Sequence, residues 1–206
     1  MSRSKNREAL THEAILTAAL RLVDEEGLTA LSMRRVGDAL GVEAMSLYNH
    51  VPSKAALLDG LYERIVSGVL PARKARSWRD HLRHQAAGLR AALALHPHAI
   101  PIFAARPAVN LGALRRLEGN LAVLREAGFS PLASLQMVQI VFAYVVGHAL
   151  WSLSPRTDAT QVNYTELDPQ ELRHVREAAE GLSAYDAEAE FALGLDALLR
   201  GFVDAP

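Results

Sequence analysis

Residues 31–50 hold the feature that most constrains this chain, a glycine between two short apolar helical patterns. After Ser32, apolar side chains recur every three or four positions, which predicts a short helix with a serine cap. Gly41 stands where the chain must enter the left-handed region to turn sharply, a conformation that glycine adopts without steric penalty. Val42 and Leu47 give the next helix an apolar face. The stretch therefore predicts two helices across a tight turn, the geometry of a helix-turn-helix.

The second of these helices directs small, polar and aromatic side chains outward. In a helix-turn-helix, such side chains lie against the major groove of DNA. We expect residues 43–50 to enter the groove, with Met45, Ser46 and Asn49 reading base edges and Ala44 touching a thymine methyl group. The residues expected to contact phosphates are Arg34, Tyr48, His50 and Lys54. Lys54 opens a helix, where a cation opposes the helix dipole, so a neighbouring phosphate would explain its presence.

Composition indicates the fold class. Half of the 206 residues are hydrophobic, and apolar runs at helical spacing alternate with prolines. No alternating strand pattern of convincing length occurs, so we predict an all-α protein. The chain has no cysteine, which excludes disulfides and thiolate metal sites and fits a reducing cytoplasm. The first residues lack the apolar core of a signal peptide, and we expect a cytoplasmic protein.

Net charge gives no general case for nucleic-acid binding. It is −1, and within residues 1–70 the acidic residues slightly outnumber Lys and Arg. The strongly basic domain usual in DNA-binding proteins is therefore missing. What remains is local, in a basic arm with Arg3, Lys5 and Arg7 and in the cations at Arg34 and Lys54. A solvated surface would explain these residues alone, whereas the helix-turn-helix makes phosphate contact the better interpretation for the last two.

The segments before and after the helix-turn-helix make this pattern more specific than a helical hairpin. An amphipathic helix is predicted over 11–26, and Ser53 is placed to cap another helix. Residues 31–61 resemble the DNA-binding domain of the tetracycline repressor (TetR) family through four patterns: Gly27-Leu-x-x-Leu31, Leu40-Gly-Val42, Leu47-Tyr48-x-His50 and Lys54-x-x-Leu57-Leu58. The resemblance implies a homodimeric transcription factor, here a repressor, that leaves a palindromic operator when a small organic inducer binds.

A domain boundary is predicted at Pro71-Ala-Arg-Lys-Ala-Arg76, where the apolar stripe of the fourth helix ends. Residues 1–70 would form the helix-turn-helix DNA-binding domain, with a linking helix from about residue 53. Residues 71–206 would form a helical regulatory and dimerisation domain. Helices are expected there over about 77–96, 100–104, 110–127, 131–153, 168–181 and 183–203, with a polar loop at 154–167.

The segment Pro131 to Leu153 is the most apolar part of the chain, and no formal charge occurs between Glu126 and Arg156. Its length would suffice for a membrane span. Polar residues within it, including Gln136 and His148, would then need partners in lipid. We prefer a helix buried on nearly all sides, as in a subunit interface.

The resemblance extends more weakly into the regulatory domain, through Ser77-Trp78-x-Asp80-x-Leu82-Arg83, Arg106-Pro107, Leu117-Glu118-x-Asn120-Leu121 and Gly128-Phe129. In the family, two helices of each subunit form a four-helix dimer interface. By position these helices would be 131–153 and 183–203. The interface residues expected on this basis are Val145, Phe191, Leu195 and Leu198.

The resemblance also implies a ligand pocket, with changed chemistry. Ile102 stands where the family has a histidine that helps to hold a drug-bound magnesium ion, and Trp151 falls where a carboxylate is expected. The pocket residues expected are Gln85, Leu89, Ile102, Phe103, Arg106, Asn120, Phe142 and Trp151. They would suit a largely apolar, aromatic molecule with an acidic or carbonyl group for Arg106, without a metal. Such a ligand would move the segment Ile100 to Arg106 against Val66 to Leu70.

Two other functions are compatible with parts of the sequence. No serine elbow, phosphate loop, paired acids or metal signature supports an enzyme, and we expect no cofactor. An apolar helical domain could still host a small-molecule enzyme, and the first four helices could serve an adaptor in protein contacts. The pairs His81 and His84, and His96 and His98, have spacings found in metal sites but no third ligand, so surface histidines are the simpler interpretation.

Overall fold

The computed structural model describes residues 10–68, 75–105, 110–153 and 163–203. Throughout these ranges the regular structure is helical and contains no strand, which confirms the all-α prediction. The helices are α1 (His12–Glu26), α2 (Met33–Leu40), α3 (Ala44–Tyr48), α4 (Lys54–Ser67), α5 (Trp78–Leu95), α6 (Ile100–Ala105), α7 (Leu111–Glu126), α8 (Pro131–Leu153), α9 (Arg173–Ala179) and α10 (Ala187–Gly201). Short 3-10 turns are η1 (Leu28–Ala30), η2 (Pro97–Ala99), η3 (Tyr164–Glu166) and η4 (Glu180–Ala184).

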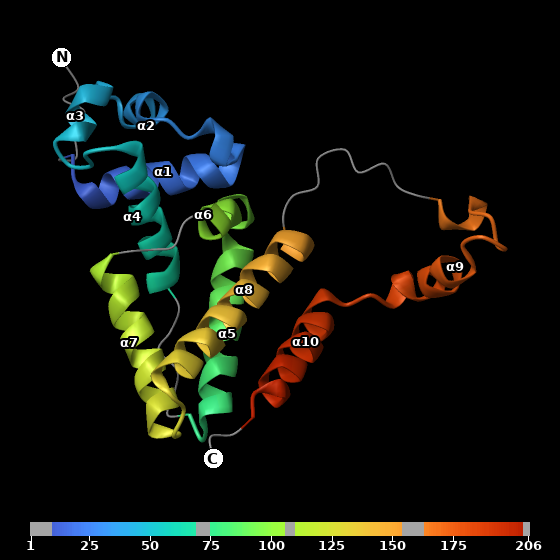
Figure 1. Ribbon diagram of the computed structural model, residues 1–206. Helices are drawn as coiled ribbons and strands as arrows, with labels where there is room; N and C mark the ends of the chain where they lie inside the picture. Colours follow the sequence, from blue (N-terminus) through green and yellow to red (C-terminus); the bar gives the residue numbers. More distant parts are fainter. Residues whose placement is uncertain (1–9, 69–74, 106–109, 154–162, 204–206) are drawn as a thin grey trace. The chain divides into compact units, whose positions relative to one another are not determined.

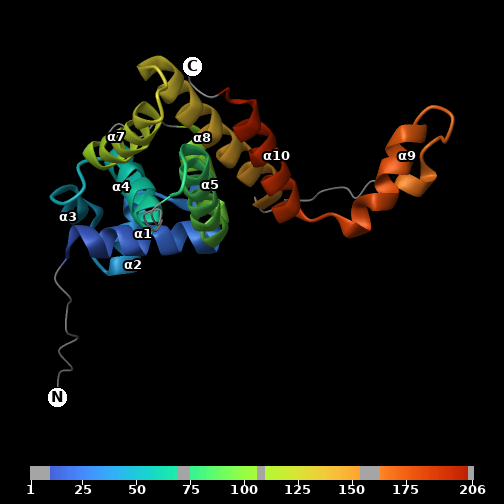
Figure 2. The same cartoon turned by 90° about the horizontal axis from the view of Figure 1, so that it is seen from below.

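Helices α1 to α8 belong to one compact unit, and residues 155–202 form a second. The predicted boundary near residue 70 is not the division between these units, because α4 packs against α5 and α6, and α1 packs against η2. Figure 2 shows α1 running past the ends of α4 and α5. A boundary near residue 70 remains a prediction from the sequence.

Serine caps fix the starts of the helices as the sequence predicts. The Ser32 hydroxyl accepts a hydrogen bond from the Arg35 amide at 3.2 Å, and the Ser53 hydroxyl accepts one from the Ala56 amide at 3.1 Å. Ser77 accepts from the Asp80 amide at 3.2 Å. Each bond satisfies an amide that the first turn of a helix leaves without an intrahelical partner. Gly41 ends α2 in the left-handed region, with φ 66°.

Helices α1 to α4 share one apolar core. Its fully buried side chains are Ile15, Val23, Leu31, Val36, Leu47, Leu57 and Leu61. Burying a side chain of this size contributes on the order of 1.5–3 kcal/mol. Helix α3 has only five residues, too few to be stable by itself, so its position depends on Leu47 in this core.

Two predicted helices differ from the observed ones. Asp168 caps a turn, accepting from the amides of Gln170 at 2.7 Å and Glu171 at 3.3 Å, but α9 begins only at Arg173. The capping pattern was real, and the turn that it closes does not continue as a helix. Helix α3 ends at Tyr48, so Asn49 and His50 lie beyond the helix that was expected to carry them.

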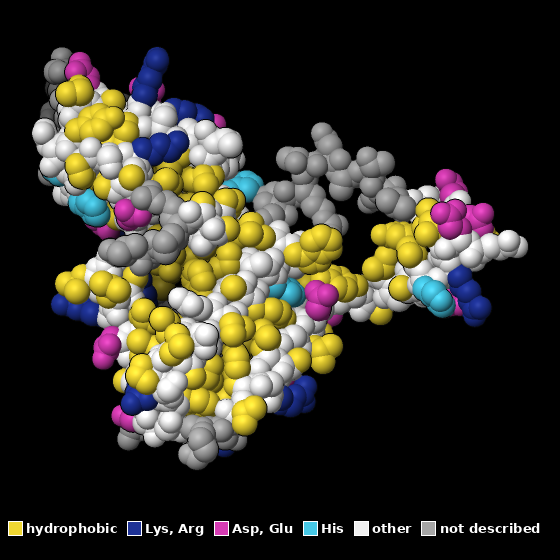
Figure 3. Space-filling model, viewed as in Figure 1, with side chains coloured by type: hydrophobic (Ala, Val, Ile, Leu, Met, Phe, Trp, Pro, Cys, Tyr) yellow, Lys and Arg dark blue, Asp and Glu magenta, His cyan; other side chains and the backbone are white. Residues whose placement is uncertain are grey.

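Pro131–Leu153 is buried on one side within the single chain, and its burial on nearly all sides in a subunit interface stays a prediction. One face of α8 packs against α5, α6 and α7, while Leu132, Ile140 and Trp151 are exposed. Among the described residues, α8 is one helix with the length and hydropathy to cross a membrane, and a third of its most apolar window is buried inside the protein. Figure 3 shows hydrophobic side chains gathered over α5 and α8.

We predict that Gly37→Ala destabilises the helix-turn-helix. A methyl group on Gly37 would lie 2.8 Å from the Val42 carbonyl oxygen and 3.2 Å from the Ala44 amide nitrogen. Both atoms are backbone, so α2 and α3 would have to separate, at about 1–3 kcal/mol. Urea unfolding measures the loss. The control is Gly119→Ala in α7, where the new methyl group meets nothing within 4 Å. A Gly37 variant as stable as this control would contradict the close packing of α2 on α3.

Candidate functional site

The first candidate surface surrounds α3. Leu47 is fully buried, whereas Met45, two positions earlier, is 72% exposed. Tyr48, Asn49 and His50 are exposed, and Ala44 and Ser46 are half-buried beside the buried face. One buried anchor thus holds a short helix whose other side chains face solvent. This arrangement leaves the predicted base-reading residues accessible to a groove of DNA.

An exposed cation precedes this helix in the chain and another follows it. Arg34 is exposed in the first turn of α2, and Lys54 is the exposed first residue of α4. The neighbouring Arg35 is engaged elsewhere, donating to Glu26 at 2.6 Å. Arg34 and Lys54 are thus exposed cations before and after α3 in the chain, although exposed Asp38 and Glu43 also stand near it in sequence and the domain as a whole is not basic. The basic arm at Arg3, Lys5 and Arg7 lies outside the described residues.

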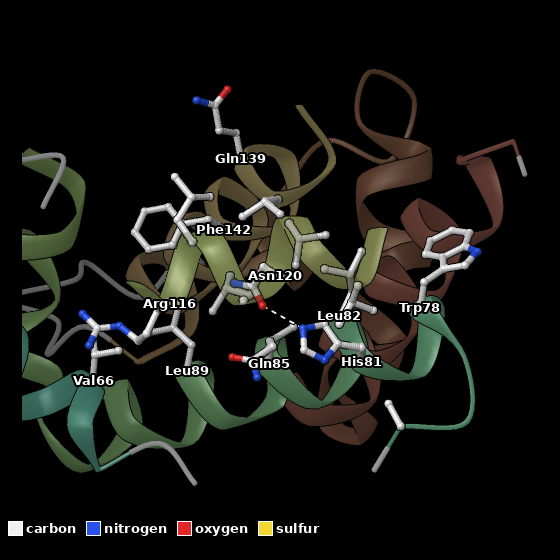
Figure 4. A pocket seen from close by; sticks show the side chains of 18 of the residues that line it. Val66, Trp78, His81, Leu82, Gln85, Leu89, Arg116, Asn120, Gln139 and Phe142 are labelled. Atoms are coloured by element: carbon white, nitrogen blue, oxygen red, sulfur yellow. Dashed lines mark hydrogen bonds between the residues drawn. The ribbon is translucent and has the colours of Figure 1, made fainter. Parts of the chain in front are cut away.

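The second candidate site is a cavity of about 990 Å³ between α4, α5, α7 and α8. Its wall is largely apolar, with Leu82 and Leu89 from α5, Leu117 from α7, Phe142 and Val145 from α8, and Val66 from α4. Figure 4 shows side chains from α5, α7 and α8 lining it. This volume, shape and lining are those of a small-molecule site.

A few polar groups interrupt the apolar wall. His81 Nε2 and Asn120 Oδ1 are 2.8 Å apart, joined by the hydrogen bond drawn in Figure 4. Gln85 lies one helical turn after His81 on the same wall. Tyr62 also lines the cavity, and burial raises the pKa of its phenol although the charge of Arg116 acts in the opposite sense. These groups can orient a ligand by hydrogen bonds.

Arg116 is the one lining residue of the cavity that is held by a carboxylate from α4. Its Nη1 donates to Glu63 Oε2 at 3.0 Å, and its Nη2 donates to Glu63 Oε1 at 2.6 Å. Burial alone would raise the pKa of Glu63, but the hydrogen bonds from Arg116 and Asn110 and the charge of Arg116 lower the pKa below its ordinary value. The pair is a two-pronged charge-assisted contact that ties α4 to α7.

Two family profiles match the chain, one over each candidate site's part of the sequence. The profile of bacterial regulatory proteins of the tetR family matches residues 15–61. The profile of the tetracyclin repressor-like C-terminal domain matches residues 70–204, more than half of the chain. The chain belongs to the TetR family. It is a DNA-binding transcriptional regulator that responds to a ligand, and regulators of this family are not enzymes, which confirms the expectation that it catalyses no reaction.

Individual relatives extend the match. A transcriptional regulator of the helix-turn-helix type from Saccharopolyspora erythraea is 37% identical over 145 residues, which span 70% of this chain and 61% of that relative. The class D tetracycline repressor of Escherichia coli is 31% identical over 94% of this chain and 89% of its own length. The Streptomyces coelicolor TetR-family protein ActR, crystallised in complex with (S)-DNPA, superposes with a TM-score of 0.79 at 25% identity, over 93% of this chain and 96% of that one.

The cavity of this TetR-family chain contains four of the residues predicted for the ligand pocket, Gln85, Leu89, Asn120 and Phe142. Ile102 and Phe103 are buried in α6 but are not among its lining residues. Phe103 instead stacks on Tyr62, with the ring centroids 4.5 Å apart. Arg106, the expected anchor for an acidic group, lies outside the described residues.

Two residues of α8 lie elsewhere than the family pattern predicts. Trp151, expected in the pocket, is 70% exposed and does not line it, whereas Val145, expected at the dimer interface, is fully buried in the cavity wall. Helix periodicity gives the reason. Trp151 follows Phe142 by about two and a half turns and so faces the opposite side, while Val145 follows it by less than one. Assignment by position along the family pattern ignored this rotation.

Sequence reasoning missed Arg116, His81 and Tyr62 as cavity residues. Arg116 stands in an amphipathic helix, where a solvated cation is the usual interpretation. One signal was available, because Arg116 precedes the predicted Asn120 by four positions and so shares its face of α7. The described residues contain no group of three His, Asp or Glu side chains placed to bind a metal ion. A metal-free ligand stays a prediction.

We predict that Glu63→Gln lowers the free energy of unfolding at neutral pH, because it removes the charge that Arg116 stabilises. A carboxylate whose pKa is lowered by folding stabilises the protein above its unfolded pKa, here near the ordinary value of 4.5. That stabilisation is lost as the pH falls through the lowered pKa. Urea unfolding should therefore show a difference between wild type and variant at pH 7 that shrinks in acid. Glu118→Gln, at an exposed position of α7, is the control and should show no such difference.

Proposed function

We propose that this regulator is a repressor that binds a palindromic operator as a homodimer and leaves it when a small organic inducer enters the cavity between α4, α5, α7 and α8. The observation that carries the DNA-binding part is the exposure of Met45 and Tyr48 on a helix anchored by buried Leu47. Met45, Ser46 and Asn49 read base edges, and Ala44 contacts a thymine methyl group. Because the operator is chromosomal or plasmid DNA, the protein acts in the cytoplasm.

Phosphate contacts set the position of α3 in the groove. Arg34 and Lys54, at the starts of α2 and α4, neutralise phosphates on either side, and Tyr48 and His50 add hydrogen bonds. Such contacts depend on salt and not on sequence, because counterions are released when phosphates are neutralised. They supply affinity, while the side chains of α3 supply the choice of operator.

Family members act as dimers, and we propose that α8 and α10 form the interface here. The outer face of α8 exposes Leu132, Ile140 and Trp151 on a helix without charged residues. Along α10, Phe191, Leu195 and Leu199 recur every four positions as an apolar stripe that is already buried in the single chain, with half-buried Leu198 beside it. The apolar side chain that α10 leaves exposed is Leu193, at 68%. Large exposed apolar patches mark sites of association. Two-fold symmetry would then place the α3 helices about 34–36 Å apart, one turn of DNA.

The inducer is largely apolar, in keeping with the leucines and Phe142 of the cavity wall, and carries polar atoms for His81, Gln85 and Asn120. ActR, the relative crystallised with (S)-DNPA, supports a small organic ligand for a fold of this kind. The ligand shifts the protein away from the DNA-bound state only by the difference between its affinities for the two states. Its contacts must therefore include α4, which carries both Lys54 and the cavity residue Val66.

Lys54→Ala is expected to weaken binding to every DNA sequence by a similar factor. Removing one phosphate contact should lower the slope of log K against log salt by about 1. Fluorescence anisotropy with the gene's own upstream region and with unrelated DNA, over a series of salt concentrations, measures both effects. Arg115→Ala, which removes an exposed cation of α7, should change neither. A loss confined to one base position would show that Lys54 reads sequence.

Ile140→Asp is expected to turn the dimer into a folded monomer. The substitution places a charge on the exposed apolar face of α8, where a partner subunit would bury it without a counter-ion. Analytical ultracentrifugation gives the mass, and circular dichroism shows whether the helices persist. Leu95→Asp is the matched control, since Leu95 is 76% exposed at the end of α5. An Ile140 variant that stays dimeric would place the interface elsewhere. Val145→Asp is unsuitable because Val145 lies in the cavity wall.

A further inference from the structure

We propose that Arg116 is the anchor for an acidic group of the inducer, and that an organic anion bound there competes with Glu63 and so loosens α4 from α7. This inference rests on the proposed function, because it assumes that the inducer occupies the cavity. It adds the chemical class of the ligand, an aromatic or aliphatic organic acid. It also identifies the contact between Glu63 and Arg116 as the one through which that acid acts on α4 and the helix-turn-helix.

Arg116 holds Glu63 and also borders the cavity. Its side chain lines the cavity and is 34% exposed, while two of its N–H groups hold the Glu63 carboxylate. A guanidinium has five N–H donors in one plane, so three remain for other acceptors. Figure 4 shows Arg116 on α7 on the same side of the cavity as Val66 of α4. A carboxylate in the cavity can therefore reach the same cation that Glu63 holds.

The Glu63 carboxylate packs against the first turn of α7. A methyl group on Gly112 would lie 2.5 Å from Glu63 Oε2, so the carboxylate packs closely against this glycine and would have to shift for a larger residue. Asn110, the cap of α7, also donates a hydrogen bond to Glu63. The next residue back, Tyr62, lines the cavity and stacks on Phe103 of α6. This turn of α4 is consequently held by α6 and α7 together and forms part of the cavity wall.

Charge selects the class of ligand. The Arg residues that line the cavity are Arg76 and Arg116, and the lining residue with a carboxylate is Glu126. Glu126 is ten residues from Arg116 along α7, about 15 Å at the rise of an α-helix. The lining residues Tyr62, Val66, Leu89 and Leu117 provide an apolar setting for Arg116. A neutral ligand that displaced Glu63 would leave the guanidinium without a counter-ion in these surroundings, whereas an anion replaces the lost charge.

Two naphthalene probes test the anchor with the full-length protein. 8-Anilinonaphthalene-1-sulfonate is an organic anion, and N-phenyl-1-naphthylamine has the same rings without the charged group; both fluoresce when they enter an apolar cavity. Arg116→Gln should weaken binding of the anionic probe by about tenfold or more, the size of one charged hydrogen-bonded contact. It should change the affinity for the neutral probe by no more than about twofold. Glu63→Gln should strengthen binding of the anionic probe and leave the affinity for the neutral probe unchanged. Arg115→Gln is the control for general surface charge.

The outcomes separate the two proposals. If Arg116→Gln leaves anion binding unchanged while both probes still bind, the anchor is wrong and the cavity stands. If wild type binds neither probe, the cavity is not a ligand site, and both the inducer proposal and the anchor fall. The double variant of Glu63→Gln and Arg116→Gln removes the pair as a whole and guards against misfolding of a single variant. In that background the effect of Glu63→Gln on the anion should disappear.

Hydrogen–deuterium exchange tests the consequence for α4. The anionic probe should raise exchange in residues 62–67, and the neutral probe should not. Glu63→Gln without any probe should show raised exchange in the same segment, because the contact with α7 is already broken. Exchange in that segment that is unaffected by Glu63→Gln would overturn the idea that Glu63 and Arg116 hold α4, even if Arg116 binds the anion.

Discussion

The structure depends on the way α4 takes part in two packed regions at once. Leu57 and Leu61 are fully buried in the core that also holds Ile15 and Leu47. The next residue, Tyr62, and Val66 about one turn further on form part of the cavity wall. A rigid helix that is fixed at both ends cannot shift in one region without disturbing the other, because packed interiors tolerate little change of volume. The coupling of ligand to DNA therefore has a physical route through a single helix.

Polar contacts reinforce this route at defined points. Arg64 of α4 pairs with Glu13 of α1, and Glu63 pairs with Arg116 of α7. At the far end of α1, His96 Nδ1 lies 2.9 Å from the Asp24 carboxylate, and His98 Nδ1 lies 2.9 Å from the Asp24 carbonyl oxygen. Directional bonds of this kind fix the relative positions of helices more sharply than apolar packing does. They also break in discrete steps, which suits a protein that must change between two states.

Helix α8 shows how one apolar sequence can serve two purposes. Val141 and Val145 close the cavity on one side, and Ile140 and Trp151 face solvent on the other. A charged residue would be costly on either face if the exposed side is covered by a second subunit. A cavity on one face and the proposed interface on the other would together account for the lack of charge along the whole helix.

Features that depend on neighbouring residues in the chain were determined by the sequence alone. The caps at Ser32 and Ser53, the left-handed Gly41 and the buried Leu47 follow from backbone chemistry and helix periodicity within a few positions, and they identify the helix-turn-helix. The tertiary structure decided which faces of the long helices meet. It turned Val145 inward and Trp151 outward, and it brought Arg116 against Glu63, 53 residues away. Periodicity gives the angle between two residues on one helix but not the rotation of that helix against its neighbours, which only the packed core fixes.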